Sequence, residues 1–152
     1  VTAVNSMATL NKGAAAAMQE VGVNAATDVT GFGLLGHLVQ MMKASATSAT
    51  VNWSAIPFLP GAIDLAHAGS TSGGTRRNME ALEGKVLYGE GISEFEFMVL
   101  ADAQTSGGML ISVPEERSVA LIKSLIANQT LYSEIIGRIG NDGLSGTVKI
   151  EY

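Results

Sequence analysis

The amino-acid sequence predicts one α+β domain, in which helices pack on a layered mixed sheet. Helical runs and short strand-like runs alternate along the chain, which is the pattern of a sheet covered by helices. The last two strand-like runs, 134–139 and 147–152, flank a turn signal at 140–143 and predict a terminal hairpin. The hydrophobic fraction of 47% is enough to form a core, and the length of 152 residues suits one domain but is too short for two.

The first half of the chain predicts a helix, a strand and a second helix. Residues 6–20 carry apolar side chains at helical spacing, and Gly22 is the expected stop of this helix. A strand is expected at 24–28, followed by the clearest amphipathic helix of the chain at 31–44. A strand, a short helix, a polar loop and another short helix then follow at 50–53, 63–67, 69–75 and 76–82.

The second half predicts two strands and two helices before the hairpin. One helix begins at Ser93 with Glu96 three residues later, which is a capping-box pattern. The other follows Pro114 and has acidic residues in its first turn, where the helix dipole favours them. The expected ranges are 85–88 and 109–113 for the strands, and 93–102 and 115–127 for the helices.

Charge and composition exclude several classes of function. The net charge of −5 excludes a general binder of nucleic-acid backbones or of anionic membranes. Zero cysteines exclude disulfides, thiolate metal sites and a cysteine nucleophile within this chain. No run approaches the roughly 18 apolar residues of a membrane span, and no signal-peptide pattern opens the chain, so we expect a cytoplasmic location.

The charged fraction and the first residue both bear on domain organisation. Charged residues make up 15% of the chain, against about 25% in average soluble domains. This shortfall predicts a surface that another domain or chain partly covers. Since the chain opens on Val1 rather than Met, we expect a fragment of a longer protein.

The most informative motif runs from Thr27 to Leu38 and joins a strand to a glycine-rich helix start. Asp28 ends the strand, and Thr30 and Gly31 precede the helix. Exposed N–H groups and the helix dipole at such a start attract phosphate, and a carboxylate beside them can hold Mg²⁺, which prefers oxygen ligands. The same residues are also compatible with a simpler role, in which Asp28 and Thr30 only cap the helix.

Gly31, Gly33 and Gly36 spell the dinucleotide fingerprint, but the surrounding sequence does not fit it. A dinucleotide-binding unit needs an acidic residue about 20 positions further on, at the end of the next strand. This chain has Thr50–Trp53 there and no acid before Asp64. We therefore reject a nicotinamide cofactor.

Two further polar motifs contain paired glycines. Gly73–Asn78 combines a possible anion nest with the planar donors of Arg76, although paired arginines are usually only solvated. Asp102–Gly108 precedes an apolar strand and can either line a pocket or cap the preceding helix. His37 and His67 lack metal-ligand partners at helical spacing, and both are interpreted as structural.

In this order, Thr27–His37, Gly73–Asn78 and Asp102–Gly108 closely resemble the C-terminal half of the selenophosphate synthetase (selenide, water dikinase) family. The resemblance covers essentially the whole chain. The family belongs to a superfamily with aminoimidazole ribonucleotide (AIR) synthetase, thiamine-monophosphate kinase and a hydrogenase-maturation protein. It implies that residues 1–152 are a single C-terminal domain of the AIR-synthetase type, layered α+β with partial ferredoxin-like similarity.

The resemblance also implies a function. Such enzymes convert ATP, selenide and water to selenophosphate, AMP and phosphate for selenocysteine synthesis. ATP and Mg²⁺ lie between the two domains, and the position of Asp28 supplies one metal ligand. Contacts of Thr30, Gly31 and Arg76 with phosphate are expected from helix-end and guanidinium physics.

The rest of the family's catalytic machinery does not match this chain. The family's reactive cysteine or selenocysteine and its lysine belong to an N-terminal domain that is absent here, so we expect no catalytic residue in this chain and no activity from it alone. Expected partners are that N-terminal domain, a second copy in a homodimer, and the substrates ATP and selenide. Two alternatives stay open: a sibling ATP-dependent kinase or synthetase with another acceptor, and a non-catalytic binding or assembly module.

Overall fold

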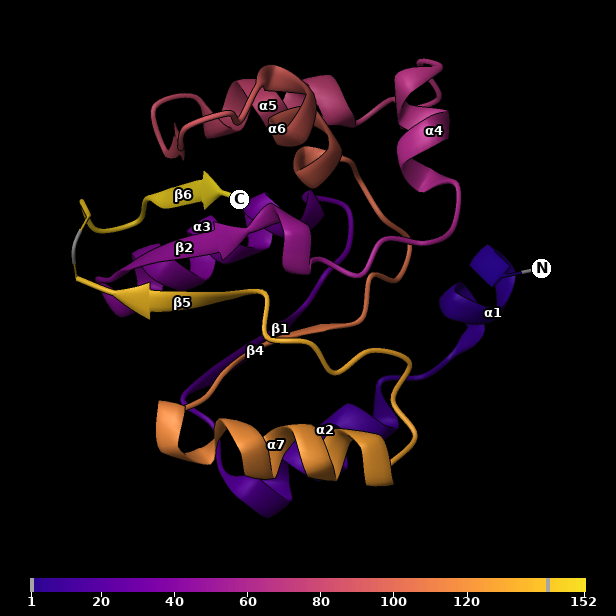
Figure 1. Cartoon of the computed structure of the whole chain (residues 1–152), viewed down its shortest axis with the longest axis vertical. Coiled ribbons are helices and arrows are strands. Elements are labelled where there is room, and N and C mark those ends of the chain that lie inside the picture. Colours follow the sequence, from indigo (N-terminus) through magenta and orange to yellow (C-terminus); the bar gives the residue numbers. More distant parts are fainter. Residues whose placement is uncertain (1, 142) are drawn as a thin grey trace.

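The computed structural model describes residues 2–141 and 143–152, and its larger sheet is mixed (Figure 1). The strand order is β3 (Val86–Tyr88), β6 (Val148–Glu151), β2 (Ser48–Asn52) and β5 (Gly137–Gly140). β6 runs parallel to both β3 and β2, whereas β5 is antiparallel to β2. Together with the helices that cover this sheet, the pattern confirms the predicted α+β class.

The predicted terminal hairpin is wrong. β5 and β6 do not pair with each other but lie on opposite sides of β2, where Thr50 is opposite Arg138 on one side and Lys149 on the other. β6 takes an inner position because Val148 and Ile150 are completely buried, whereas most of β5 is exposed. Asp142, part of the expected turn, lies outside the described residues.

A serine side chain supports the connection between β5 and β6. The Ser48 hydroxyl donates to the carbonyl of Gly140 at 3.0 Å and accepts from the N–H of Gly143 at 3.1 Å. Ser48 is the first residue of β2, so the connection crosses that end of the strand and brings β6 to its other side.

Three helices build the main core with the larger sheet: α3 (Gly33–Ser45), α5 (Thr75–Leu82) and α6 (Glu94–Ala101). α3 packs against β2 and β6 of the sheet and also against α5 and α6. The largest fully buried side chains of this core are Leu35, Met42, Val51, Leu100, Val148 and Ile150.

A smaller core lies between α2 (Lys12–Val21) and α7 (Glu115–Ala127), which pack together below the larger sheet in Figure 1. Its buried apolar side chains are Ala14, Ala17, Leu121 and Leu125. An antiparallel ribbon of β1 (Ala25–Asp28) and β4 (Met109–Ser112) leads from this helix pair to the main core. The outer end of the ribbon joins the helices, and Asp28 lies at its inner end.

The first expected helix is divided in two. α1 (Thr2–Ala8) ends where the Thr9 hydroxyl and N–H both donate to the carbonyl of Asn5, and α2 starts only at Lys12. α2 is fixed by its packing on α7, with Gly13 directly against the carbonyl of Asn128, whereas α1 buries no side chain. The predicted stop at Gly22 is confirmed, since this residue adopts a φ of 76° and donates to Met18.

The remaining helices are the short η1 (Trp53–Ala55) and α4 (Ala62–His67). The ring of His67 stacks on Phe95 of α6 with centroids 3.8 Å apart, which joins α4 to the main body and agrees with the structural role predicted for this histidine. Nine other predicted elements are present, each within two residues of its predicted limits. They are the strands expected at 24–28, 50–53, 85–88 and 109–113 and the helices expected at 31–44, 63–67, 76–82, 93–102 and 115–127.

Candidate functional site

The first and third motifs lie side by side at the inner end of the β1–β4 ribbon. Asp28 is opposite Met109 in the register of the two strands. Beyond this pair the N–H of Val29 donates to the carbonyl of Gly108 at 3.0 Å, and the N–H of Gly107 donates to the carbonyl of Val29 at 2.8 Å. The backbone that follows Asp28 is therefore held in place by hydrogen bonds to Gly107 and Gly108.

The same contact continues into the first turn of α3. The carbonyl of Thr30 accepts from the N–H of Gln104 at 3.1 Å and from that of Gly33 at 3.0 Å. Gly33 adopts a φ of 69°, and a Cβ at this position would lie 2.7 Å from the backbone carbonyl group of Ala101. A glycine is required here because the start of α3 touches the end of α6 directly.

The second motif is bonded to the other two through side chains. Nδ2 of Asn78 donates to the carbonyl of Gly31 and to that of Ala101, each at 2.9 Å. Oδ1 of Asp102 accepts from the N–H of Ser72 at 2.9 Å and from the hydroxyl of Thr75. The three polar motifs thus form one continuous region, which we call the motif site: residues 27–37, 72–78 and 101–108.

The N-terminus of α3 has no side-chain cap. Its N-cap residue, Phe32, makes no capping hydrogen bond. Thr30 does not cap the helix either, because its N–H donates to Nε2 of His37 at 3.1 Å and its hydroxyl lies 3.3 Å from the same nitrogen. The side-chain capping role considered for Thr30 is therefore wrong, and the first-turn N–H groups after that of Gly33 are left for another acceptor.

His37 has the structural role that the sequence predicts. Since Nε2 accepts from the amide of Thr30, the ring proton belongs on Nδ1 when the imidazole is neutral. Its ring also lies 5.5 Å from that of Phe32. Both contacts fix the loop between β1 and α3.

Gly31 is the open point of the motif site. It is exposed, and a Cβ on this residue would meet no other part of the chain within 4 Å. A ligand can therefore approach the backbone closely just before the bare turn of α3.

Asp28 is the acidic side chain nearest this opening in sequence. It is exposed, and within the part of the chain that the structure describes no side chain or N–H donates to its carboxylate. The described residues contain no group of three His, Cys, Asp or Glu side chains able to hold a metal ion. Asp28 suits one oxygen ligand of Mg²⁺, but a full coordination sphere needs ligands from elsewhere.

Arg76 lies in the first turn of α5, next to the paired glycines. Its side chain is 90% exposed, and its Nε donates to Glu80 at 3.1 Å across one helical turn. Exposed ion pairs of this kind contribute little to stability. The guanidinium is thus held loosely and can exchange Glu80 for another anion.

The other end of α6 is anchored by the predicted capping box, which the structure confirms. The N–H of Ser93 donates to Glu96 at 2.8 Å, and the N–H of Phe95 donates to the Ser93 hydroxyl at 3.2 Å. Burial raises the pKa of Glu96, but hydrogen bonds from Ser93 and Tyr152 outweigh it, and the net pKa lies below the ordinary value of 4.5. The charged carboxylate thereby orients the helix whose last residues reach the motif site.

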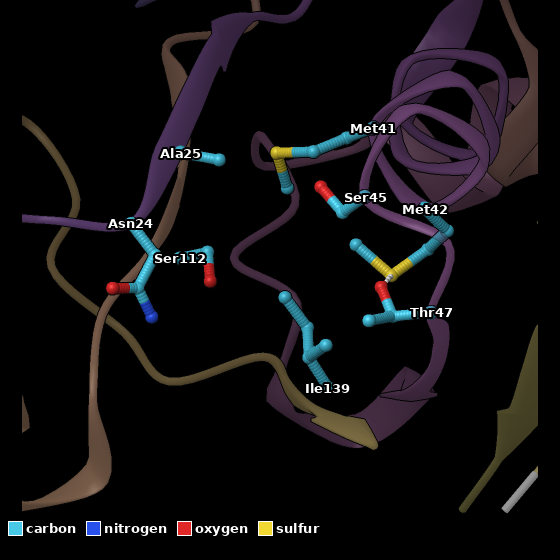
Figure 2. Close-up of a pocket in the computed structure, with 8 residues that line it drawn as sticks. All are labelled: Asn24, Ala25, Met41, Met42, Ser45, Thr47, Ser112 and Ile139. Atoms are coloured by element: carbon cyan, nitrogen blue, oxygen red, sulfur yellow. Dashed lines mark hydrogen bonds between the residues drawn. The ribbon is translucent and has the colours of Figure 1, made fainter. Parts of the chain in front are cut away.

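A cavity of about 140 Å³ lies at the opposite end of α3 (Figure 2). Met41, Met42 and Ser45 from the last turns of α3 face Ile139 of β5 and the outer end of the ribbon across it. α3 has 13 residues and is about 20 Å long, so this cavity is separate from the motif site.

The hydrogen bonds of the Asn78 and Asp102 side chains to distant segments could not be predicted from the sequence. Asn78 is the last residue of the second motif, yet the partners of its amide are 47 and 23 residues away in the sequence. No local pattern reveals such partners, because an asparagine in a helix has many other uses.

Among the described residues, no helix is both long and apolar enough to span a bilayer.

Comparisons with known proteins identify the family of this chain. Residues 3–149 match the family described as "AIR synthase related protein, C-terminal domain". "Selenide, water dikinase 2" of Peptoclostridium acidaminophilum is 41% identical over 136 residues, which are 90% of this chain and 39% of the relative. "Selenide, water dikinase" of Caldanaerobacter subterraneus subsp. tengcongensis is 44% identical over 138 residues, with 90% and 40% covered. The chain thus spans about two-fifths of the length of these relatives.

Solved structures share the fold at lower identity. Hydrogenase maturation protein HypE in complex with ATP superimposes with a TM-score of 0.60 and 22% identity, over 95% of this chain and 37% of HypE. At this identity the likeness concerns the fold alone. The family match, which covers nearly the whole chain, and the shared fold lead to one conclusion: this chain belongs to the AIR synthase related protein C-terminal domain family.

Proposed function

We propose that residues 1–152 form the C-terminal domain of a selenide, water dikinase and supply part of its ATP and Mg²⁺ site. The observation that carries the proposal is the joining of the three motifs around the bare start of α3, with Asp28 at its edge. The names of the relatives support the choice of reaction, in which ATP, selenide and water give selenophosphate, AMP and phosphate.

Each proposed ligand contact follows from a described feature. Asp28 would hold Mg²⁺, which when bound neutralises charge on the phosphates. The first-turn N–H groups of α3, reached over the open backbone of Gly31, suit a phosphate oxygen. The hydroxyl of Thr30 borders this turn, and the exposed guanidinium of Arg76 can add positive charge from α5.

The remaining chemistry would come from outside this chain. Zero cysteines mean that it lacks the family's reactive thiol, and Asp28 alone does not complete a metal site. We therefore propose that an N-terminal domain carries the nucleophile, its lysine and further metal ligands, that the complete protein is a cytoplasmic homodimer, and that residues 1–152 alone are inactive.

The test is an activity assay of the natural full-length gene product with MgATP and selenide. We expect formation of AMP and selenophosphate that depends on selenide, and ³¹P NMR measures both products. Asp28→Asn should lower kcat/KM about 100-fold, because a neutral amide neither attracts the metal nor neutralises it. Asp64→Asn, which changes an exposed acid on α4, should have no effect and is the matched control.

The outcomes separate the alternatives. ATP consumption that does not depend on selenide would favour a sibling enzyme with another acceptor, which the shared fold with HypE makes the second candidate. Full magnesium-dependent activity in Asp28→Asn would remove this residue from the metal site and favour a binding or assembly module. Turnover by residues 1–152 alone would refute the need for a second domain.

A further inference from the structure

We propose that Asn78 is a positioning residue of the nucleotide site: it holds the phosphate-facing start of α3 at a set distance from the end of α6. The inference rests on the proposed function and assigns a role to the second motif that its arginines do not explain. Both N–H bonds of the Asn78 amide group are used, one on the carbonyl of Gly31 and one on that of Ala101. One side chain thus joins the first motif to the third.

The two carbonyls stand at the point where the helices touch. Gly31 lies just before the bare turn of α3, and Ala101 is the completely buried last residue of α6. Gly33, two residues after Gly31, fits directly against the backbone of Ala101. Asn78 therefore spans the same contact that Gly33 makes by close packing, and it fixes the contact from the solvent side.

Asn78 is itself held firmly. α5 starts at Thr75, which is 3% exposed and donates its hydroxyl to Asp102, while Asp102 also accepts from the N–H of Ser72. The N–H of Asn78 donates to the carbonyl of Gly74 at 3.0 Å. The amide of Asn78 thus projects from an anchored helix turn, unlike the neighbouring Arg76, which projects into solvent.

The chemistry of the clamp demands an amide. An aspartate has nearly the same shape, but it has no N–H to donate and would place negative charge against two carbonyl oxygens. The entry into α3 would then move away from α6, together with the N–H groups that suit a phosphate. Displacements of about 1 Å at a reacting group are enough to slow catalysis strongly.

The test compares Asn78→Asp with Asn128→Asp in the natural full-length gene product. Asn128 is the matched control, because its Nδ2 also donates to a backbone carbonyl, that of Ser124 at 2.9 Å, but at the end of α7, away from the motif site. We expect Asn78→Asp to weaken MgATP binding and raise its KM about tenfold. Hydrogen exchange should also become faster in residues 29–36. Asn128→Asp should leave both properties unchanged.

Several outcomes would overturn the inference. Unchanged MgATP affinity in Asn78→Asp would do so, as would an equal loss in both variants, which indicates general destabilisation. If Asn78→Asp does not fold, Asn78→Ala removes the donors without adding charge and decides the same question. Absence of MgATP binding by the wild type would refute the clamp as well.

The failure of the proposed function is recognised separately. A wild type that binds MgATP but shows no selenide-dependent turnover refutes the proposed reaction, and the affinities of the two variants still decide the role of Asn78. An active wild type whose Asn78→Asp variant keeps its affinity refutes only the clamp.

Discussion

Gly31 and Gly33 lie two positions apart at the start of α3 and need glycine for different reasons. Gly33 adopts a positive φ and touches the backbone of α6, so its missing side chain is a requirement of the fold. Gly31 faces open space, so its missing side chain costs the fold nothing and leaves room for a ligand. Within one helix start, Gly33 is therefore needed for stability, and Gly31 is available for ligand binding.

Alanine substitutions test this division. Gly33→Ala should lower the free energy of unfolding by about 2–3 kcal/mol, because it adds backbone strain and a clash with Ala101. Gly31→Ala should change it by no more than about 0.5 kcal/mol but weaken MgATP binding about tenfold. Urea unfolding and nucleotide titration measure the two effects. Equal loss of stability in both variants would contradict the distinction.

At the scale of elements, α6 connects a titratable anchor to the motif site. The Glu96 carboxylate accepts from Ser93 at the start of the helix and from the Tyr152 hydroxyl at 3.0 Å. This hydrogen bond, with burial and the negative charge of Glu96, raises the pKa of the Tyr152 phenol. The charged form of Glu96 therefore holds the last residue of the chain to the start of α6.

The sign of the pH dependence follows from the lowered pKa of Glu96. A carboxyl group with a lower pKa in the folded state stabilises the fold above its unfolded value, near 4.5, and this contribution is lost as the pH falls through the folded value. Glu96→Gln should therefore lose stability at pH 7 and show a shallower decline in acid. Urea unfolding between pH 7 and pH 3 checks this, with the exposed Glu90→Gln as control. Parallel curves for wild type and Glu96→Gln would count against the anchor.

The elements also show which parts of the fold a sequence can predict. The capping box was predictable because Ser93 and Glu96 are three residues apart. The strand partner of β5 was not, since its pairing depends on β6 burying Val148 and Ile150 between β2 and β3. In the motif site the resemblance identified all three segments, whereas the bonds of Asn78 exist only after distant segments have folded together.

At the scale of the whole molecule, the low charge content agrees with a surface rich in exposed apolar side chains. α1 and the turn after it expose Val4, Met7 and Leu10, the last of them by 80%. Exposed apolar side chains that gather in one segment are typical of surfaces that meet another domain. In the proposed function this covering domain is the N-terminal half.

Removal of α1 tests whether it contributes to the fold. A chain that starts at Thr9 should keep its Tm within about 2 °C, because α1 buries no side chain. Leu125→Ala, which empties a buried position of the smaller core, should cost about 2–5 kcal/mol and lower the Tm clearly. Calorimetry of both variants checks the comparison, and an equally large loss without α1 would show that the helix is docked.

The ribbon of β1 and β4 contributes side chains to both cores of the molecule. Met109 and Ile111 of β4 pack against the small α2–α7 core, whereas Leu110 between them and Val29, just beyond Asp28, belong to the main core. We therefore expect local opening of the helix pair to loosen β4 at both Met109 and Ile111. Because Met109 is the strand partner of Asp28, such an opening should reach the acid, which ties the position of Asp28 to the stability of the smaller core.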